Sequence, residues 1–315
     1  MFEQGLISLL RPDELTIPPV ELGRAIVEAI EADGKYELMI FARSTSAEKE
    51  KAAGGVPIIA VDYSSVDSLV EALEKHKIDT LFSVVDANGG AESEFNLIKA
   101  ADKSKVTKRF VPNIWGSEYV GWFLDFYVAP RVKTYMFPFS AFIDMAHDVA
   151  AIPGTGDVPV VYTCKSCQPR ETIPSLLSET DADPATNSPD TFDIAAFAAA
   201  SLSLPKWEKE TYAVGDRLTV NEFLAIAEEV KGTKFAVSHD SMETMSAGKS
   251  TQLPAYEPLY SVMPKEVLTG VIAVFGVMFE NGQFDFEGKH LINTEFPEIK
   301  PRKVREMLVE AWGKK

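Results

Sequence analysis

The chain has 315 residues, of which 46% are hydrophobic and 25% charged, a composition typical of one large globular domain or two unequal ones. Its formal net charge is -16 and its pI is about 4.8, which argues against nucleic acid and anionic membranes as partners. An anionic cofactor can still bind through a local arginine or a helix N-terminus. The longest apolar run, Val267 to Phe279, is shorter than the roughly 18–20 residues that a membrane span needs. Because the N-terminus lacks a signal-peptide pattern, we expect a cytoplasmic protein.

Short apolar strands alternate with amphipathic helices between residues 22 and 112. Leu22, Ile26 and Ile30 are spaced four apart and indicate a first helix at 22–32. Ser64 and Asp67 have the spacing of a capping box at the start of a second helix. The expected strands are 37–41, 57–61, 80–85 and 109–111, and the expected further helices are 66–76 and 92–101. Such alternation predicts an α/β fold with a Rossmann-type, doubly wound parallel sheet.

The second half of the chain is mainly helical in its pattern. Thr219 and Glu222 form a capping box before one of these helices. Its expected helices are 191–204, 221–230, 265–279 and one from Pro301 to Trp312, with a short strand at 234–237. We therefore expect a Rossmann-like domain at 1–120 and a smaller, interleaved substrate-side domain at 121–315. Residues 165–190 are rich in Pro, Ser, Thr and Asp without periodicity, which predicts a disordered surface insert.

Two cysteines, Cys164 and Cys167, occur as C-K-S-C. They are either incidental loop cysteines or a redox or metal-binding pair. Zinc would need two more ligands, and the four histidines form no spaced cluster with this pair. The sequence therefore predicts no metal site.

Several motifs, in the same order along the chain, resemble the NmrA-like family. This family is an atypical group of short-chain dehydrogenases/reductases that includes isoflavone-reductase-like enzymes. The motifs are L-G-R-A-I-V-E-A-I at 22–30, F-A-R-S-T-S at 41–46, V-D-Y-S-S at 61–65, R-F-V-P-N-I-W-G-S-E-Y at 109–119, G-W-F-L-D-F-Y at 121–127, A-I-P-G-T-G at 151–156, T-F-D-I-A-A-F at 191–197 and G-D-R-L-T-V-N-E-F at 215–223. The resemblance implies an NADP-dependent oxidoreductase acting on a small aromatic or unsaturated substrate. The family's namesake members imply an alternative, a dinucleotide-sensing regulator that binds partner proteins.

The resemblance also implies which residues hold the cofactor. Arg43 follows the second strand, where an arginine accommodates the 2′-phosphate of NADP, although a solvated loop arginine is the alternative. Asp62 stands where the family contacts the adenine side, or else it only leads into the next helix. Pro112 and Trp115 lie in the segment that the family places beside the nicotinamide, where Trp115 either packs against that ring or fills the core. Gly23 alone fits the glycine pattern of the phosphate loop.

The sequence departs from the family at the phosphate loop. A strand and a G-x-x-G-x-x-G turn should precede Gly23, but the residues there are Ile17-Pro18-Pro19-Val20-Glu21. Pro18 and Pro19 have no N–H to offer a phosphate. Residues 1–20 contain no convincing first strand, and Leu6–Leu10 is expected at most to pair with the sheet edge. The first strand is therefore expected to be missing.

Further departures follow Tyr119 and within 165–190. The family has a helix with a catalytic lysine after the fifth strand, whereas Gly121–Leu124 follows Tyr119 almost at once, too soon for a crossover helix. No tyrosine has a lysine four positions later, so the catalytic residues are unknown. Removing 165–190 would restore the order of the family's motifs, and all three departures are either real or misjoined exons. The sequence thus predicts an impaired reductase, with a regulator or a non-binding remnant as alternatives.

Overall fold

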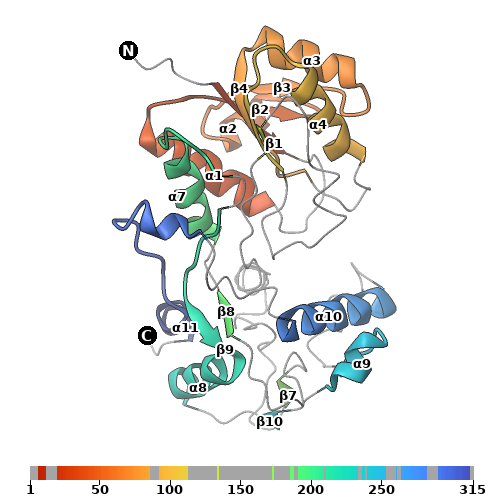
Figure 1. The fold of residues 1–315 in the computed structure, drawn as a ribbon, viewed down its shortest axis with the longest axis vertical. Helices are drawn as coiled ribbons and strands as arrows, with labels where there is room; N and C mark the ends of the chain where they lie inside the picture. The colour runs from red at the N-terminus through yellow and green to blue at the C-terminus, as the bar shows by residue number, and fades with distance from the viewer. Residues whose placement is uncertain are drawn as a thin grey trace. The chain divides into compact units, whose positions relative to one another are not determined.

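The computed structural model describes thirteen stretches of the chain: 6–11, 20–85, 92–112, 133–134, 172–173, 185–187, 191–208, 211–232, 236–237, 240–252, 260, 264–281 and 290–312. The chain divides into two compact units. The first comprises Met1–Pro138, Thr191–Ala213 and Lys289–Lys300, and the second comprises Phe139–Asp190, Val214–Gly288 and Pro301–Lys315. Figure 1 labels most of the elements of both units. No described helix has the length and hydropathy of a membrane-spanning segment.

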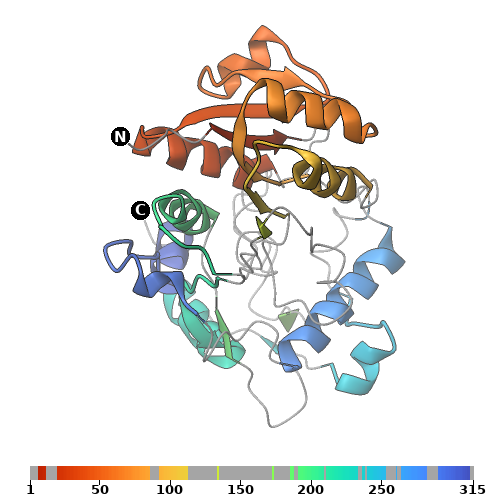
Figure 2. The same cartoon turned by 45° about the horizontal axis from the view of Figure 1, so that its top comes forward.

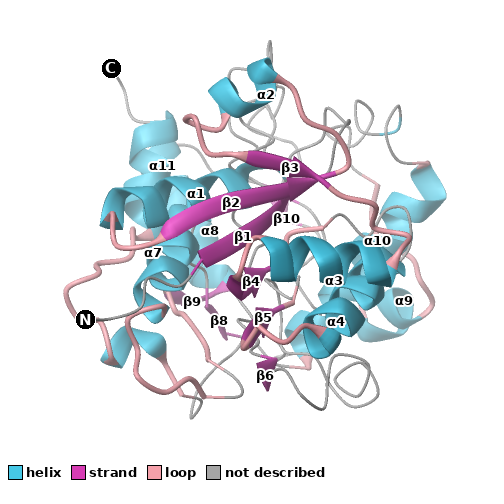
Figure 3. Cartoon of the chain, turned by 90° about the horizontal axis from the view of Figure 1, so that it is seen from above, coloured by secondary structure: helices cyan, strands magenta, loops and turns pink. Residues whose placement is uncertain are grey.

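The first unit is built on a six-stranded parallel sheet with strand order β3-β2-β1-β4-β5-β6. The strands are β1 (Leu6–Arg11), β2 (Glu37–Ala42), β3 (Ile58–Ala60), β4 (Ile78–Phe82), β5 (Arg109–Val111) and β6 (Lys133–Thr134). Figure 3 shows this sheet from above. The order is that of doubly wound dinucleotide-binding sheets, so the predicted Rossmann-type fold is confirmed.

The expectation of a missing first strand is wrong. Leu6–Arg11 forms β1 in the middle of the sheet, where Leu10 pairs with Phe41 of β2 and Leu9 pairs with Phe82 of β4. The expected pairing at the sheet edge is wrong for the same reason. A short, mostly apolar run is what a central parallel strand requires, because both of its faces are covered. The phosphate-loop prediction for residues 12–19 lies outside the described residues.

Helices cover the sheet in two pairs (Figure 1). Helix α1 (Val20–Asp33) packs against α7 (Thr191–Ser201), and α3 (Val66–Lys75) packs against α4 (Glu92–Lys103). Figure 2 shows α7, in green, beside the red α1, although the two are far apart in the sequence. The core on the α3/α4 side is formed by side chains that include Phe41, Leu69, Leu73, Leu81, Leu97 and Phe110.

Three details differ from the sequence-based expectations. The N-cap of α3 is Ser65, whose Oγ accepts from the Ser68 N–H at 3.3 Å, and not Ser64. The short helix α2 (Ala47–Ala52) was not expected, because its residues have no apolar periodicity. The last helix, α11 (Val304–Trp312), begins three residues after Pro301, at a backbone N–H that donates to the carboxylate of Asp216 at 3.2 Å.

The second unit contains two helix pairs and two small sheets. Helix α8 (Val220–Lys231) packs against α11, and α9 (Met242–Ser246) packs against α10 (Lys265–Glu280). Strand β8 (Ala185–Asn187) pairs antiparallel with β9 (Arg217–Thr219), and β7 (Thr172–Ile173) pairs parallel with β10 (Ala236–Val237). Residues 172–173 and 185–187 are the described parts of the segment 165–190, and the insert expected there otherwise lies outside the described residues. The 3-10 helix η4 (Ile292–Thr294) belongs to the first unit.

Candidate dinucleotide-binding site

The strand order reverses between β1 and β4, which lie side by side at the centre of the sheet. In open α/β sheets, ligands bind in the crevice beyond the carboxyl ends of the strands at such a switch point. Four of the five predicted site residues lie in described segments, and three of these directly follow or nearly follow the carboxyl end of a strand. They are Arg43 after β2, Asp62 after β3 and Pro112 after β5.

Gly23 lies in the first turns of α1 and is buried. A Cβ atom at this position would stand 3.0 Å from Cγ2 of Val84, which follows the end of β4 by two residues. The absence of a side chain therefore lets α1 approach the turn after β4. In the dinucleotide-binding fingerprint, the third glycine has this packing role, so Gly23 matches that glycine.

Arg43 is the exposed first residue of the loop between β2 and α2. Nζ of Lys49 donates to Oγ of the neighbouring Ser44 at 2.7 Å, and Ser46 caps α2 by accepting from the Lys49 N–H at 3.2 Å. Within the described residues, Arg43 itself forms no ion pair or hydrogen bond. The loop thus presents one arginine and one lysine in a fixed turn, which suits an added phosphate group. Sequence reasoning missed Ser44 and Lys49, and the only signal was the serine cap before a short charged run.

Asp62 forms a tight turn at the entrance to α3. Its Oδ1 accepts from the Ser64 N–H at 2.9 Å and from the Ser64 hydroxyl at 2.7 Å. These two hydrogen bonds, first from the side chain and then from the backbone, lower the pKa of the exposed Asp62 carboxyl below its ordinary value. Asp62 therefore leads into the helix as an ionised group, and its role on the adenine side stays a prediction.

A buried hydrogen bond fixes the turn after β4. The Ser83 hydroxyl donates to the carboxylate of Glu94 in α4, and the Ser83 N–H donates to the Val111 carbonyl at 2.7 Å. Glu94 is only 5% exposed. These two bonds hold Ser83, the residue before Val84, against α4 and β5. Sequence reasoning missed the bond to Glu94, because a glutamate in the first turn of a helix is normally exposed.

Pro112 is buried directly after β5, while Trp115 lies outside the described residues, as does the predicted gap after Tyr119. The structure therefore describes only the start of the segment expected beside the nicotinamide. Cys164 and Cys167 also lie outside it. Among the residues that can be described, no three His, Cys, Asp or Glu side chains gather as metal ligands.

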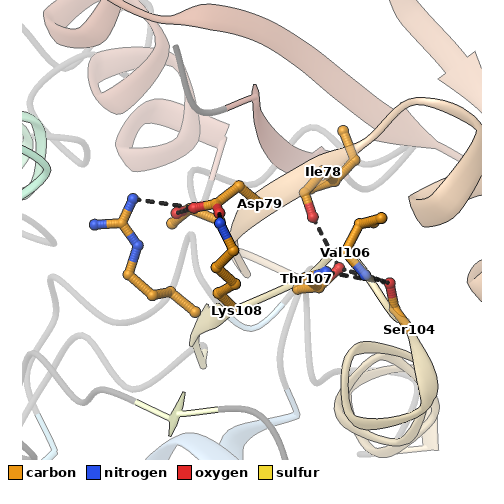
Figure 4. Close-up of polar contacts among 8 residues, drawn as sticks. Ile78, Asp79, Ser104, Val106, Thr107 and Lys108 are labelled. Carbon is orange, nitrogen blue, oxygen red and sulfur yellow. Dashed lines mark hydrogen bonds and ion pairs between the residues drawn. The ribbon is translucent and has the colours of Figure 1, made fainter. Parts of the chain in front are cut away.

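A second polar cluster lies at the opposite, amino edge of the sheet (Figure 4). Asp79 in β4 forms ion pairs with Lys108 at 2.9 Å and Arg109 at 3.2 Å. Burial of the carboxyl raises its pKa, but hydrogen bonds from Lys108 and Thr80 and the nearby positive charges outweigh burial, so the pKa of Asp79 is lowered. This cluster joins the amino ends of β4 and β5, whereas the candidate site lies beyond the carboxyl ends of the strands.

Residues 21–117 match the family model described as "NAD(P)H-binding". Across nearly its whole length, the chain is also similar to a fungal protein named as an oxidoreductase. It is 28% identical to "Oxidoreductase BOA1" of Botryotinia fuckeliana (strain B05.10), and the match covers 89% of this chain and 92% of that protein. Residues 21–117 of the Rossmann-type sheet thus resemble NAD(P)H-binding domains, and the chain resembles proteins named as oxidoreductases.

Solved reductase structures share the fold. The leucoanthocyanidin reductase of Vitis vinifera in complex with NADPH has a TM-score of 0.68 at 18% identity, covering 98% of this chain and 100% of that chain. An NADPH-dependent quinone oxidoreductase of Escherichia coli, also with NADPH, has a TM-score of 0.67 at 16% identity, covering 96% and 99%. At such identities the likeness establishes the fold. Together with the family-model match, it confirms the predicted resemblance to isoflavone-reductase-like, NmrA-like proteins.

Proposed function

We propose that this chain prefers NADPH to NADH and is built to reduce a small aromatic or unsaturated organic substrate. The observation that carries the proposal is the place of Arg43, exposed directly after β2 and next to the Ser44–Lys49 hydrogen bond. Sheets of this class that select NAD carry an acidic residue there, whose carboxylate binds the ribose hydroxyls. An arginine instead pairs with the oxygens of the 2′-phosphate. The NADPH complexes among the similar folds support this cofactor class.

The described residues fit the adenosine end of such a cofactor. In this proposal Gly23 allows the close packing of α1 on the turn after β4, Arg43 binds the 2′-phosphate, and Asp62 contacts the adenine side. Pro112 and Trp115 are proposed to flank the nicotinamide. When bound, NADPH would supply the hydride, while the chain would orient the cofactor and the substrate.

The diphosphate is expected to be held poorly. Residues 12–19, between the end of β1 and the start of α1, read P-D-E-L-T-I-P-P and contain no glycine. The prolines offer no N–H, and the two acidic residues repel phosphate. The family's catalytic lysine has no match either. We therefore expect weakened cofactor binding and slow turnover.

The names of the similar proteins favour an enzyme over the regulator that the resemblance also allows, because the fungal relatives are named oxidoreductases. Binding of NADPH without turnover of any quinone or enone would favour the dinucleotide-sensing regulator with a protein partner. Binding of neither dinucleotide would leave a non-binding remnant. A cytoplasmic location remains a prediction from the sequence.

The preference is tested by calorimetric titration with NADPH and NADH. Replacing Arg43 by alanine should weaken NADPH binding about tenfold or more, because charge-assisted hydrogen bonds to the 2′-phosphate are lost, and should leave NADH binding nearly unchanged. Arg305→Ala, which removes an exposed arginine of α11 that pairs with Glu229, is the matched control for the loss of one positive charge. Equal weakening of both dinucleotides by Arg43→Ala would remove Arg43 as the phosphate reader.

A further inference from the structure

We propose that Tyr63 is a positioning residue that sets the preference for a 2′-phosphate by holding the end of β2, and with it Arg43, in place. The inference rests on the proposed function and extends it to a residue that touches no part of the cofactor in that proposal. It concerns three described elements, β2, the turn between β3 and α3, and α4. A chain of two buried hydrogen bonds joins them.

The first bond joins Tyr63 to β2. The Tyr63 hydroxyl donates to the carbonyl oxygen of Phe41 at 3.0 Å. Phe41 is fully buried and precedes Arg43 by two residues, so its carbonyl lies in the last part of the strand before the phosphate-reading loop. The neighbouring Ala42 carbonyl accepts from the Val61 N–H at 2.8 Å. The end of β2 is therefore held by the backbone of Val61 and by the side chain of Tyr63.

The second bond joins Tyr63 to α4. The side-chain amide of Asn96 donates to the Tyr63 carbonyl at 3.0 Å, and both residues are 6% exposed. The preceding residue, Asp62, is held by the two hydrogen bonds that its carboxylate accepts from the N–H and the hydroxyl of Ser64. Tyr63 thus connects the residue proposed for the adenine side with the strand that carries Arg43, and α4 fixes both.

Packing alone does not require the hydroxyl. The ring of Tyr63 belongs to the buried cluster that includes Phe41, Leu69 and Leu97, where a phenylalanine ring would fill the same volume. Burial of a hydroxyl costs desolvation energy, which its hydrogen bond must offset. Because phenylalanine would bury the same apolar area, what tyrosine adds at this position is the hydrogen bond. The specific consequence of that bond is a fixed Phe41 carbonyl, two residues from Arg43.

The test uses two probes that contain only the adenosine end of the cofactor, adenosine 2′,5′-bisphosphate and AMP. The dissociation constant of AMP divided by that of the bisphosphate measures the preference for the 2′-phosphate without the nicotinamide half. Tyr63→Phe should lower this ratio about fivefold, the effect of one hydrogen bond, by weakening the bisphosphate and not AMP. In an Arg43→Ala background, Tyr63→Phe should no longer change the ratio, because the positioned group is absent.

Thr107→Val is the matched control. The Thr107 hydroxyl donates to the Ile78 carbonyl at 2.9 Å in a buried setting at the amino edge of the same sheet (Figure 4). The substitution removes the same kind of bond far from Arg43, so it should lower stability without changing the ratio. Asn96→Leu is a second variant. It removes the hydrogen bond from the Asn96 amide to the Tyr63 carbonyl and should also lower the ratio.

The outcomes separate the two proposals. If the wild-type chain prefers the bisphosphate and both Tyr63→Phe and Asn96→Leu keep that preference, the positioning role is overturned and the proposed function stands. If Thr107→Val lowers the ratio as much as Tyr63→Phe, the effect is one of stability and the positioning role is again overturned. If the wild-type chain shows no preference for the bisphosphate, the proposed NADPH selectivity fails, and the inference fails with it.

Discussion

Gly23 is required where it stands because of a contact and not because of its backbone freedom. A Cβ atom added at position 23 would lie 3.0 Å from Cγ2 of Val84, which is closer than ordinary van der Waals contact. Gly23→Ala should therefore lower the free energy of unfolding by about 1 kcal/mol, since an overpacking cost of about 1–3 kcal/mol exceeds the gain of about 1 kcal/mol in helix propensity. Urea unfolding of the single variants and of Gly23→Ala/Val84→Ala tests the contact. The alanine at 23 should become neutral or stabilising when Val84 is truncated, and an equal cost in both backgrounds would disprove it.

Individual site residues were predictable where chain order alone decides their place. Arg43 and Asp62 follow apolar strands, so their position at the carboxyl edge of the sheet could be read from the sequence. Tyr63 and Glu94 could not be recognised, because their roles depend on partners 22 and 11 residues away, respectively. Periodicity shows which face of an element is apolar, and it does not show which buried polar groups meet across that face.

The strands β4 and β5 are joined at their amino ends by Asp79, which makes their junction dependent on pH. The folded-state pKa of Asp79 lies below the ordinary value of 3.8. A carboxyl whose pKa is lowered by folding stabilises the fold at pH values above its unfolded-state pKa. This contribution is lost as the pH falls through the folded-state pKa. Asp79→Asn should therefore lower the free energy of unfolding by about 1 kcal/mol at pH 7.

This difference should shrink when the pH is lowered from 5 towards 3 and below, because the wild-type carboxyl is then protonated as well. Urea unfolding of both proteins across that range measures it. Lys206→Ala, at an exposed ion pair with Glu208, is a control that should change stability little at any of these pH values. A difference between wild type and Asp79→Asn that stays constant with pH would show that the carboxylate charge is not what stabilises the junction.

Most elements of the sheet were predicted, and β1 was misjudged for a physical reason. Strands β2, β3, β4 and β5 are apolar runs followed or preceded by helices, so the sequence indicates them, whereas the two-residue β6 has no such pattern. Leu6–Arg11 has the same apolar character, but the residues after it lack the glycine turn that normally identifies a first strand. The absence of this turn from the sequence argues against a Rossmann first strand, but it does not prevent the apolar run from pairing. The strand forms because β1 pairs with both β2 and β4, and this pairing does not depend on the sequence of the loop that follows.

The chain alternates between its two units, which the sequence could not specify in detail. Helix α7 follows the long segment 165–190 and packs against α1 in the first unit, while β8, just before it, pairs with β9 in the second. An Ala-rich helix has no strongly polar face, and its sequence therefore does not indicate which surface it will cover. The pairing of β7 with β10 and of β8 with β9 likewise joins residues far apart in the chain. Such long-range contacts are set by tertiary packing.

We propose that the chain keeps the adenosine end of an NADPH site, while residues 12–19 bind the diphosphate poorly. Calorimetric titration of the full chain with NADPH and with adenosine 2′,5′-bisphosphate distinguishes these two contributions. We expect measurable binding of both, with dissociation constants within about tenfold of each other, because the rest of the dinucleotide adds little binding energy. NADPH binding more than about a hundredfold tighter than the bisphosphate would show that residues 12–19 hold the diphosphate well, and no binding of either would show that the adenosine site is not retained.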